Sequence, residues 1–134
     1  MCDWFIFHLD QDTRVINIDI NTQVLLETQP YDSDEADDLC TDVLIPMIVD
    51  IRKMCIDKGY TQQCVVDMKD VDVTLMNPIV LTRIIWNIYE YSKDEPENLI
   101  QRFEIINSNT LFRGFYRVSK TLLPVYLTNL ITIS

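Results

Sequence analysis

Short apolar segments alternate with amphipathic segments along this chain. Residues 4–9 and 14–20 are rich in β-branched and aromatic side chains, and Ile16, Ile18 and Ile20 alternate with more polar neighbours. A period of two is typical of a strand with one buried face. The pattern predicts two strands joined near residues 11–13.

An amphipathic helix is expected over residues 39–58, because apolar side chains recur at helical spacing up to Gly59, which supplies a helix stop. Pro46 lies inside this segment and must either kink the helix or mark a later start. The acidic run between Pro30 and Asp42 lacks the glycine and terminal glutamate of a calcium loop. We therefore expect that run to be a solvated loop whose carboxylates favour the N-terminus of the following helix.

The second half of the chain repeats the alternation. Residues 64–68 predict a strand buried on both faces, and Asn77 followed by Pro78 predicts the start of a helix that continues to about Ser92. A short turn opening at Pro96 is followed by a strand at residues 103–106.

A last helix is expected to begin at Ser108 or Asn109 and to end at Pro124, before a terminal strand at residues 130–133. The order ββαβαβαβ predicts an α/β fold with a single mixed, mostly parallel sheet and helices packed on it. At 134 residues without a low-complexity linker, residues 1–134 are expected to form one domain.

Charge and composition exclude several classes of function. A net charge of −10 disfavours nucleic acid as a partner, and it equally disfavours unaided binding to anionic membranes, so at most peripheral membrane contact is expected. Two glycines cannot build a Gly-rich phosphate loop. No apolar run is long enough for a membrane span, and the first residues do not read as a signal peptide, so a cytoplasmic location is expected, in the host cytosol if the chain is viral.

Candidate catalytic and metal-binding chemistry is sparse. The four cysteines form no C-x-x-C pair and His8 is the single imidazole, so we expect buried free thiols, no metal site and no cofactor. Asp67, at the end of a predicted strand, is the best catalytic candidate, yet neither a G-x-S-x-G elbow nor a Cys-His signature accompanies it. We expect no enzyme.

Three segments occur in a fixed order over residues 65–130. They are VVDMKD at 65–70, PENL at 96–99 with RFEIIN at 102–107, and LF at 111–112 with KTLLP at 120–124. This ordered set resembles the CRAL-TRIO family, the lipid-binding domains of the yeast phosphatidylinositol-transfer type. The resemblance implies a CRAL-TRIO-like α/β fold, here as a minimal member without the family's N-terminal helical lobe and C-terminal portion.

The resemblance also implies site residues. Glu97 keeps the family identity, whereas Gln62, Cys64 and Asn129 replace hydroxyl and lysine groups that contact a phosphoinositide headgroup in the family. A lipid needs a concave apolar wall with one polar mouth. The candidates for that wall are Ile84, Ile85, Ile88, Phe112 and Phe115.

Three cations stand out against the acidic composition. Arg113, Arg117 and Lys120 follow one another at i, i+4 and i+7 with Tyr116 beside them, so they share one face of the last predicted helix. They could contact a phosphate headgroup or an acidic partner protein. Alternatively, they form a solvated face, with Lys120 suited to the helix C-terminus.

The preferred interpretation is a non-catalytic protein-interaction or scaffold module derived from a lipid-binding fold. The alternative is a carrier or sensor of a lipid held between helices and sheet. A second alternative is a regulatory domain similar to STAS domains, whose element order and Asp-Leu-Ser strand end resemble Asp67-Met68-Lys69, although only Thr74 offers a hydroxyl nearby. The expected partners are another protein, a lipid, or a second copy in a homodimer that covers an open apolar face.

Overall fold

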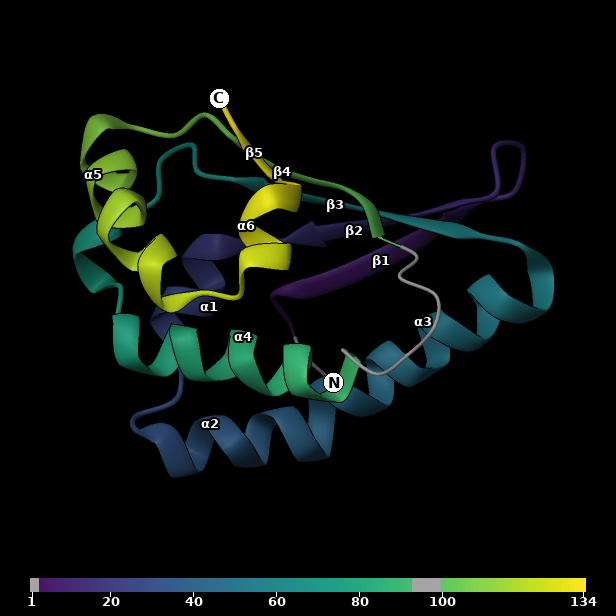
Figure 1. Cartoon of the computed structure of the whole chain (residues 1–134), viewed down its shortest axis with the longest axis horizontal. Helices are drawn as coiled ribbons and strands as arrows, with labels where there is room; N and C mark the ends of the chain where they lie inside the picture. The colour runs from purple at the N-terminus through teal and green to yellow at the C-terminus, as the bar shows by residue number, and fades with distance from the viewer. Residues whose placement is uncertain (1–2, 93–99) are drawn as a thin grey trace.

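Five strands form one mixed sheet in the computed structural model, which describes residues 3–92 and 100–134. The strands are β1 (Phe5–Asp10), β2 (Val15–Ile20), β3 (Thr61–Asp67), β4 (Ile100–Ile106) and β5 (Ile131–Ile133). They lie side by side in chain order, with β1 antiparallel to β2 and all other neighbours parallel (Figure 1). The predicted α/β class and mixed sheet are confirmed.

The connections between parallel strands contain all the helices of the described residues. From β2 to β3 run α1 (Thr22–Thr28), α2 (Ser33–Leu39), the π-helical turn η1 (Cys40–Leu44) and α3 (Ile45–Lys58). From β3 to β4 run η2 (Val73–Leu75) and α4 (Pro78–Ser92). From β4 to β5 run α5 (Thr110–Ser119), η3 (Lys120–Leu122) and α6 (Val125–Leu130).

Sequential strand order places these connections on one face of the sheet. Each crossover moves one strand further in the same direction, and crossovers between parallel strands are almost always right-handed. Connections with the same hand and direction therefore cover the same face. The helices lie on one side of the sheet in Figure 1, and the other side is uncovered by them. The result is a two-layer arrangement.

The covered face is apolar because alternate residues of neighbouring strands are in register. Ile18, Cys64, Phe103 and Ile131 occupy one row across four strands. Ile16, Ile18 and Cys64 pack against Ile51 and Cys55 of α3, and Ile105 packs against Phe112 of α5. Burial of these apolar side chains between the sheet and the helices stabilises the fold.

The uncovered face carries polar and charged side chains. Paired residues of neighbouring strands form rows across this face. One row contains Asn17, Gln63 and Arg102, and the next contains Asp19, Val65, Glu104 and Thr132. None of these side chains is fully buried. The expectation that β3 is buried on both faces is therefore wrong, since its second face is lined by polar neighbours and no helix within residues 3–92 and 100–134 covers it.

The acidic run is helical, contrary to the expectation of a loop. Asp32 is the N-cap of α2 and its carboxylate accepts a hydrogen bond from the amide of Glu35 at 2.9 Å. The carboxylate of Glu35 in turn accepts from the amide of Tyr31 at 2.7 Å. The first bond satisfies a backbone donor that a helix start leaves free, and the second holds the residue before the cap, so both favour a helix in this acidic segment.

Pro46 falls in the first turn of α3, directly after the π-helical turn η1. The helix expected over residues 39–58 corresponds to the last residue of α2, to η1 and to α3, and Gly59 ends it in the left-handed conformation. The helices α1 and α6 were not predicted. The turn expected at Pro96 lies outside the described residues.

Candidate functional site

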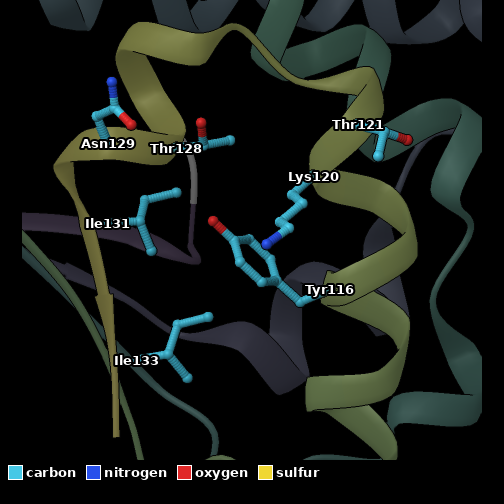
Figure 2. Close-up of a pocket in the computed structure, with 7 residues that line it drawn as sticks. All are labelled: Tyr116, Lys120, Thr121, Thr128, Asn129, Ile131 and Ile133. Atoms are coloured by element: carbon cyan, nitrogen blue, oxygen red, sulfur yellow. The ribbon is translucent and has the colours of Figure 1, made fainter.

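Two hollows stand out on the described surface, and the larger of this pair lies at the β5 edge of the sheet, on the helical side. Its volume is about 490 Å³. Helices α5 and α6, the turn η3 and the strand β5 surround it (Figure 2). Seven residues line it: Tyr116, Lys120, Thr121, Thr128, Asn129, Ile131 and Ile133.

The floor of this hollow is apolar and its rim is polar. Ile131 and Ile133 are alternate residues of β5, so both project to the covered face of the sheet. Figure 2 shows them facing the side chains of Tyr116 and Lys120 across the hollow. Desolvation by burial raises the pKa of the Tyr116 phenol above its usual value, so Tyr116 offers a neutral hydroxyl to the hollow at physiological pH.

Packing holds Tyr116 in position. Its ring stacks on that of Phe112, with 6.2 Å between the ring centroids, and Phe112 is buried against the sheet. The helix that carries both begins at Asn109, whose side chain accepts from the amide of Phe112 at 2.7 Å. The predicted helix start is thus confirmed, with Asn109 rather than Ser108 as the cap.

The lining contains one cation and no carboxylate. Lys120 supplies the positive charge, and hydroxyl and amide groups supply the other polar atoms. A concave surface with an apolar floor and a cationic, hydroxyl-bearing rim suits an amphipathic molecule with an anionic or hydroxylated end.

The predicted contact residues are only partly brought together. Tyr116 and Lys120 line the hollow, whereas Arg113 and Arg117 are exposed on α5 outside it. The guanidinium of Arg113 donates to the hydroxyl of Ser108 at 2.9 Å. Glu97 lies outside the described residues.

The five residues expected to form a lipid wall are divided between different parts of the core. Ile84 and Ile88 of α4 pack with Trp4 and the buried side of α2, in a cluster that Phe5 and Ile20 of the sheet also contact. Phe112 of α5 belongs to the cluster around Met68 and Ile105. Ile85 and Phe115 are half-buried, and none of the five lines the larger hollow: Ile84, Ile85, Ile88, Phe112 and Phe115.

Sequence reasoning missed the floor and part of the rim. Ile131 and Ile133 were predicted as strand residues, but their alternation alone does not show which helix faces them. Thr128 belongs to α6, which was not predicted. Asn129 was noted only as a replacement for a family lysine, and the structure places it at the rim.

The smaller hollow, of about 360 Å³, lies at the carboxyl ends of β2 and β3 and includes Asp19, Asp67 and Lys69. Asp67 accepts hydrogen bonds from the side chain of Asn107 and the amide of Lys69, both at 2.9 Å. The hydrogen bond from Asn107, together with that from the Lys69 amide, lowers the pKa of Asp67 below its usual value. A carboxylate held in its ionised form is a weak general base.

The thiols and acidic groups show no arrangement for metal chemistry within residues 3–92 and 100–134. No group of three His, Cys, Asp or Glu is placed to hold an ion there. Cys40, Cys55 and Cys64 are free and buried, and burial raises the pKa of Cys64 to about 12. A thiol with this pKa is a poor nucleophile at neutral pH.

Helix length also bears on how the chain could meet a membrane. Across the part of the chain that the structure describes, none of the helices has the length and apolar content that a membrane crossing requires.

Comparison with known proteins supports the fold. No protein-family model matches the chain, and no curated protein matches it in sequence. Among solved structures, the crystal structure of Sfh5 matches with a TM-score of 0.59 and 16% sequence identity. The match covers 98% of this chain and 47% of that one, so the chain spans about half the length of Sfh5. At this identity the likeness shows the fold alone, which is CRAL-TRIO-like.

Proposed function

We propose that this chain is a non-catalytic domain that binds an amphipathic ligand, such as a lipid, in the hollow between α5, α6 and β5. The observation that carries the proposal is the apolar floor of Ile131 and Ile133 beneath a rim that holds Lys120 and no carboxylate. The CRAL-TRIO-like fold supports it, because the family that the sequence resembles binds lipids.

The placement of polar residues supports the same side of the sheet. Asn17, Gln63 and Glu104 lie on the uncovered face, where an acyl chain would desolvate them without offering hydrogen bonds in return. The covered face instead presents the apolar row of Ile18, Cys64, Phe103 and Ile131, whereas Val65 lies among polar neighbours on the other face. A hydrophobic ligand is therefore best accommodated among the helices.

The first test is native mass spectrometry of the purified chain after incubation with phosphatidylcholine, phosphatidic acid or phosphatidylinositol, with lipid extraction in parallel. We expect a complex with one lipid per chain and a preference for an anionic headgroup. A chain that stays free of all three lipids, in the mass spectrum and in the extract, would overturn the proposal.

Variants of the rim connect such binding to the hollow. Lys120→Gln removes the one cation and should weaken anionic lipid binding several-fold, whereas Lys58→Gln, an exposed cation at the end of α3, should leave it unchanged. Asn129→Lys places a lysine where the resembled family has one, and it should strengthen phosphatidylinositol binding. If all of these variants bind lipid to the same extent as the wild type, the lipid binds outside this hollow.

The scaffold interpretation stays a prediction. The exposed apolar side chains of α5, Leu111 and Val118, are one feature of the described residues that a partner protein could cover. Size-exclusion chromatography with light scattering distinguishes a homodimer from a monomer, and a dimer that excludes lipid would favour this interpretation over the carrier.

A further inference from the structure

The charges of this chain are strongly segregated. The last 30 residues, from Ile105 to Ser134, contain no aspartate or glutamate and three cations, Arg113, Arg117 and Lys120. All 21 acidic residues precede them, so a chain of net charge −10 ends in a segment of charge +3. This segment includes α5, η3, α6 and β5.

Apolar side chains in the same segment are unusually exposed. Val118 and Val125 are each 72% exposed, and Leu111 and Leu122 are each 59% exposed. Scattered single apolar residues are normal on a protein surface, but four within 15 residues of chain form a concentration.

The exposed side of α5 is divided into an apolar flank and a cationic flank. Leu111 and Val118 are two turns apart and share one flank, while Arg113 and Arg117 are one turn apart and share the other. Gly114 lies between the two flanks, and a Cβ there would meet nothing within 4 Å. The inward side of the helix is held by Phe112, which is buried in the core.

A tryptophan extends the apolar flank. The indole nitrogen of Trp86 on α4 donates to the carbonyl oxygen of Leu122 at 2.6 Å, which places its ring beside that leucine. Trp86 is 36% exposed, so part of the ring faces solvent. The acidic helix α2 packs on α4, and α4 lies between α2 and the surface formed by α5 (Figure 1).

We propose that this surface, defined by Leu111, Arg113, Arg117, Val118, Leu122 and Val125, docks on the surface of a bilayer that contains anionic lipid. The valines and leucines enter the boundary between headgroups and acyl chains, while the arginines contact lipid phosphates. Trp86 reaches the same interface, where amphipathic rings are favoured.

Charge complementarity selects this occupant. The acidic remainder of the chain is repelled by an anionic surface, but this repulsion fades beyond the Debye length, about 8 Å at physiological ionic strength. Attraction therefore comes from the cations nearest the bilayer, and the charge asymmetry orients the molecule with its C-terminal segment towards the lipid. This proposal goes beyond ligand binding in the hollow and does not depend on the hollow being filled.

The test measures flotation of the full chain with vesicles of phosphatidylcholine, with or without phosphatidylserine, at low and high ionic strength. We expect binding only to vesicles with phosphatidylserine, a loss of binding at high salt, and a blue shift of tryptophan fluorescence that Trp86→Phe removes. Arg113→Gln with Arg117→Gln should weaken binding roughly 30-fold, from the contribution that each cation makes near an anionic surface.

Val118→Gln with Val125→Gln should abolish the fluorescence shift, and because both valines are exposed the fold should survive the change, as circular dichroism can verify. The matched controls are on α3: Lys53→Gln with Lys58→Gln for the cations, and the exposed Ile56→Gln for the apolar residues. No binding to phosphatidylserine vesicles overturns the proposal. Control variants on α3 that lose as much vesicle binding as the α5 variants would overturn it as well.

These outcomes are separable from those of lipid binding in the hollow. None of the residues changed on α5 lines the hollow. Vesicle binding without a one-to-one lipid complex would leave the docking surface standing and reject the ligand-binding function. A one-to-one complex without vesicle binding would do the reverse.

Discussion

Individual side chains connect elements that are far apart in this sequence. Asp37 of α2 accepts two hydrogen bonds from the guanidinium of Arg83 on α4, at 2.7 and 2.9 Å, and a third from Asn87 at 2.7 Å. The acidic run and the helix of residues 78–92 were both recognisable in the sequence, but their pairing was not, because it depends on how α4 lies across α2. By contrast, the caps at Asn77 and Asn109 were predictable, since they involve only neighbouring residues.

The pair of Asp37 and Arg83 makes stability depend on pH. The hydrogen bonds from Arg83, with that from Asn87, lower the pKa of Asp37 from 3.8 to about 2. A carboxyl whose pKa is lowered by folding stabilises the fold fully above pH 3.8, and this contribution is lost as the pH falls towards 2. Asp37→Asn should therefore lower Tm by a few degrees at pH 7, and its difference from the wild type should close in acid.

Thermal denaturation followed by circular dichroism at a series of pH values measures this effect. Asp38→Asn, an exposed carboxylate on the same helix, serves as the control and should change Tm little at any pH. A deficit of Asp37→Asn that persists unchanged at pH 2 would show that packing, and not the ion pair, accounts for it.

Whole elements were predictable where a periodic apolar face coincided with local stop signals. The helix at residues 78–92 and the strand pair β1 and β2 satisfy both conditions. Helices α1, α2 and α6, each seven residues or fewer, do not, because so short a segment gives no clear period and its stability comes from caps and tertiary contacts. The hollow was unpredictable for the same reason, since α6 forms part of it.

The two glycines occupy opposite kinds of position in these elements. Gly59 ends α3 with a φ of 70°, where a Cβ would meet only Arg14 at an ordinary 3.7 Å, so the cost of a side chain lies in the backbone. Gly59→Ala should reduce the free energy of unfolding by about 1 kcal/mol. Gly114→Ala, in open space within α5, should raise it by up to about 1 kcal/mol.

Urea denaturation of both variants against the wild type measures the two changes, and the slopes should stay equal. The two substitutions are chemically identical, so each is the control of the other. Changes of the same sign would contradict the assignment of Gly59 to a position that requires the left-handed conformation.

At the scale of the whole molecule, strand order explains most of the architecture. The alternation of strands and helices predicted a mixed sheet, and the motifs of residues 65–124 predicted its CRAL-TRIO-like form. The uncovered polar face was not recognised, because Gln63 and Glu104 acquire meaning only when the register aligns them with Asn17 and Asp19. Sequence periodicity identifies one buried face of a strand, but it does not say what covers the other.

Net charge should make the stability of the whole molecule depend on salt. With 21 acidic and 11 basic residues, repulsion among carboxylates opposes folding at low ionic strength. Raising the ionic strength to about 0.15 M should therefore increase Tm by a few degrees. Differential scanning calorimetry with sodium chloride, compared with sucrose at matched osmolality, tests this expectation, and a Tm that falls on adding salt would contradict it.

Finally, β5 contains only three residues and pairs with a single neighbour at the edge of the sheet. Ser134 follows it and binds the backbone of Ile105 and Ser108, so few hydrogen bonds hold the end of the chain. Such a strand opens locally without global unfolding, and its amides should exchange with deuterium sooner than those of β2 and β3. Because Ile131 and Ile133 form the floor of the larger hollow, the least protected strand is also the surface beneath a bound ligand, and occupancy should slow that exchange.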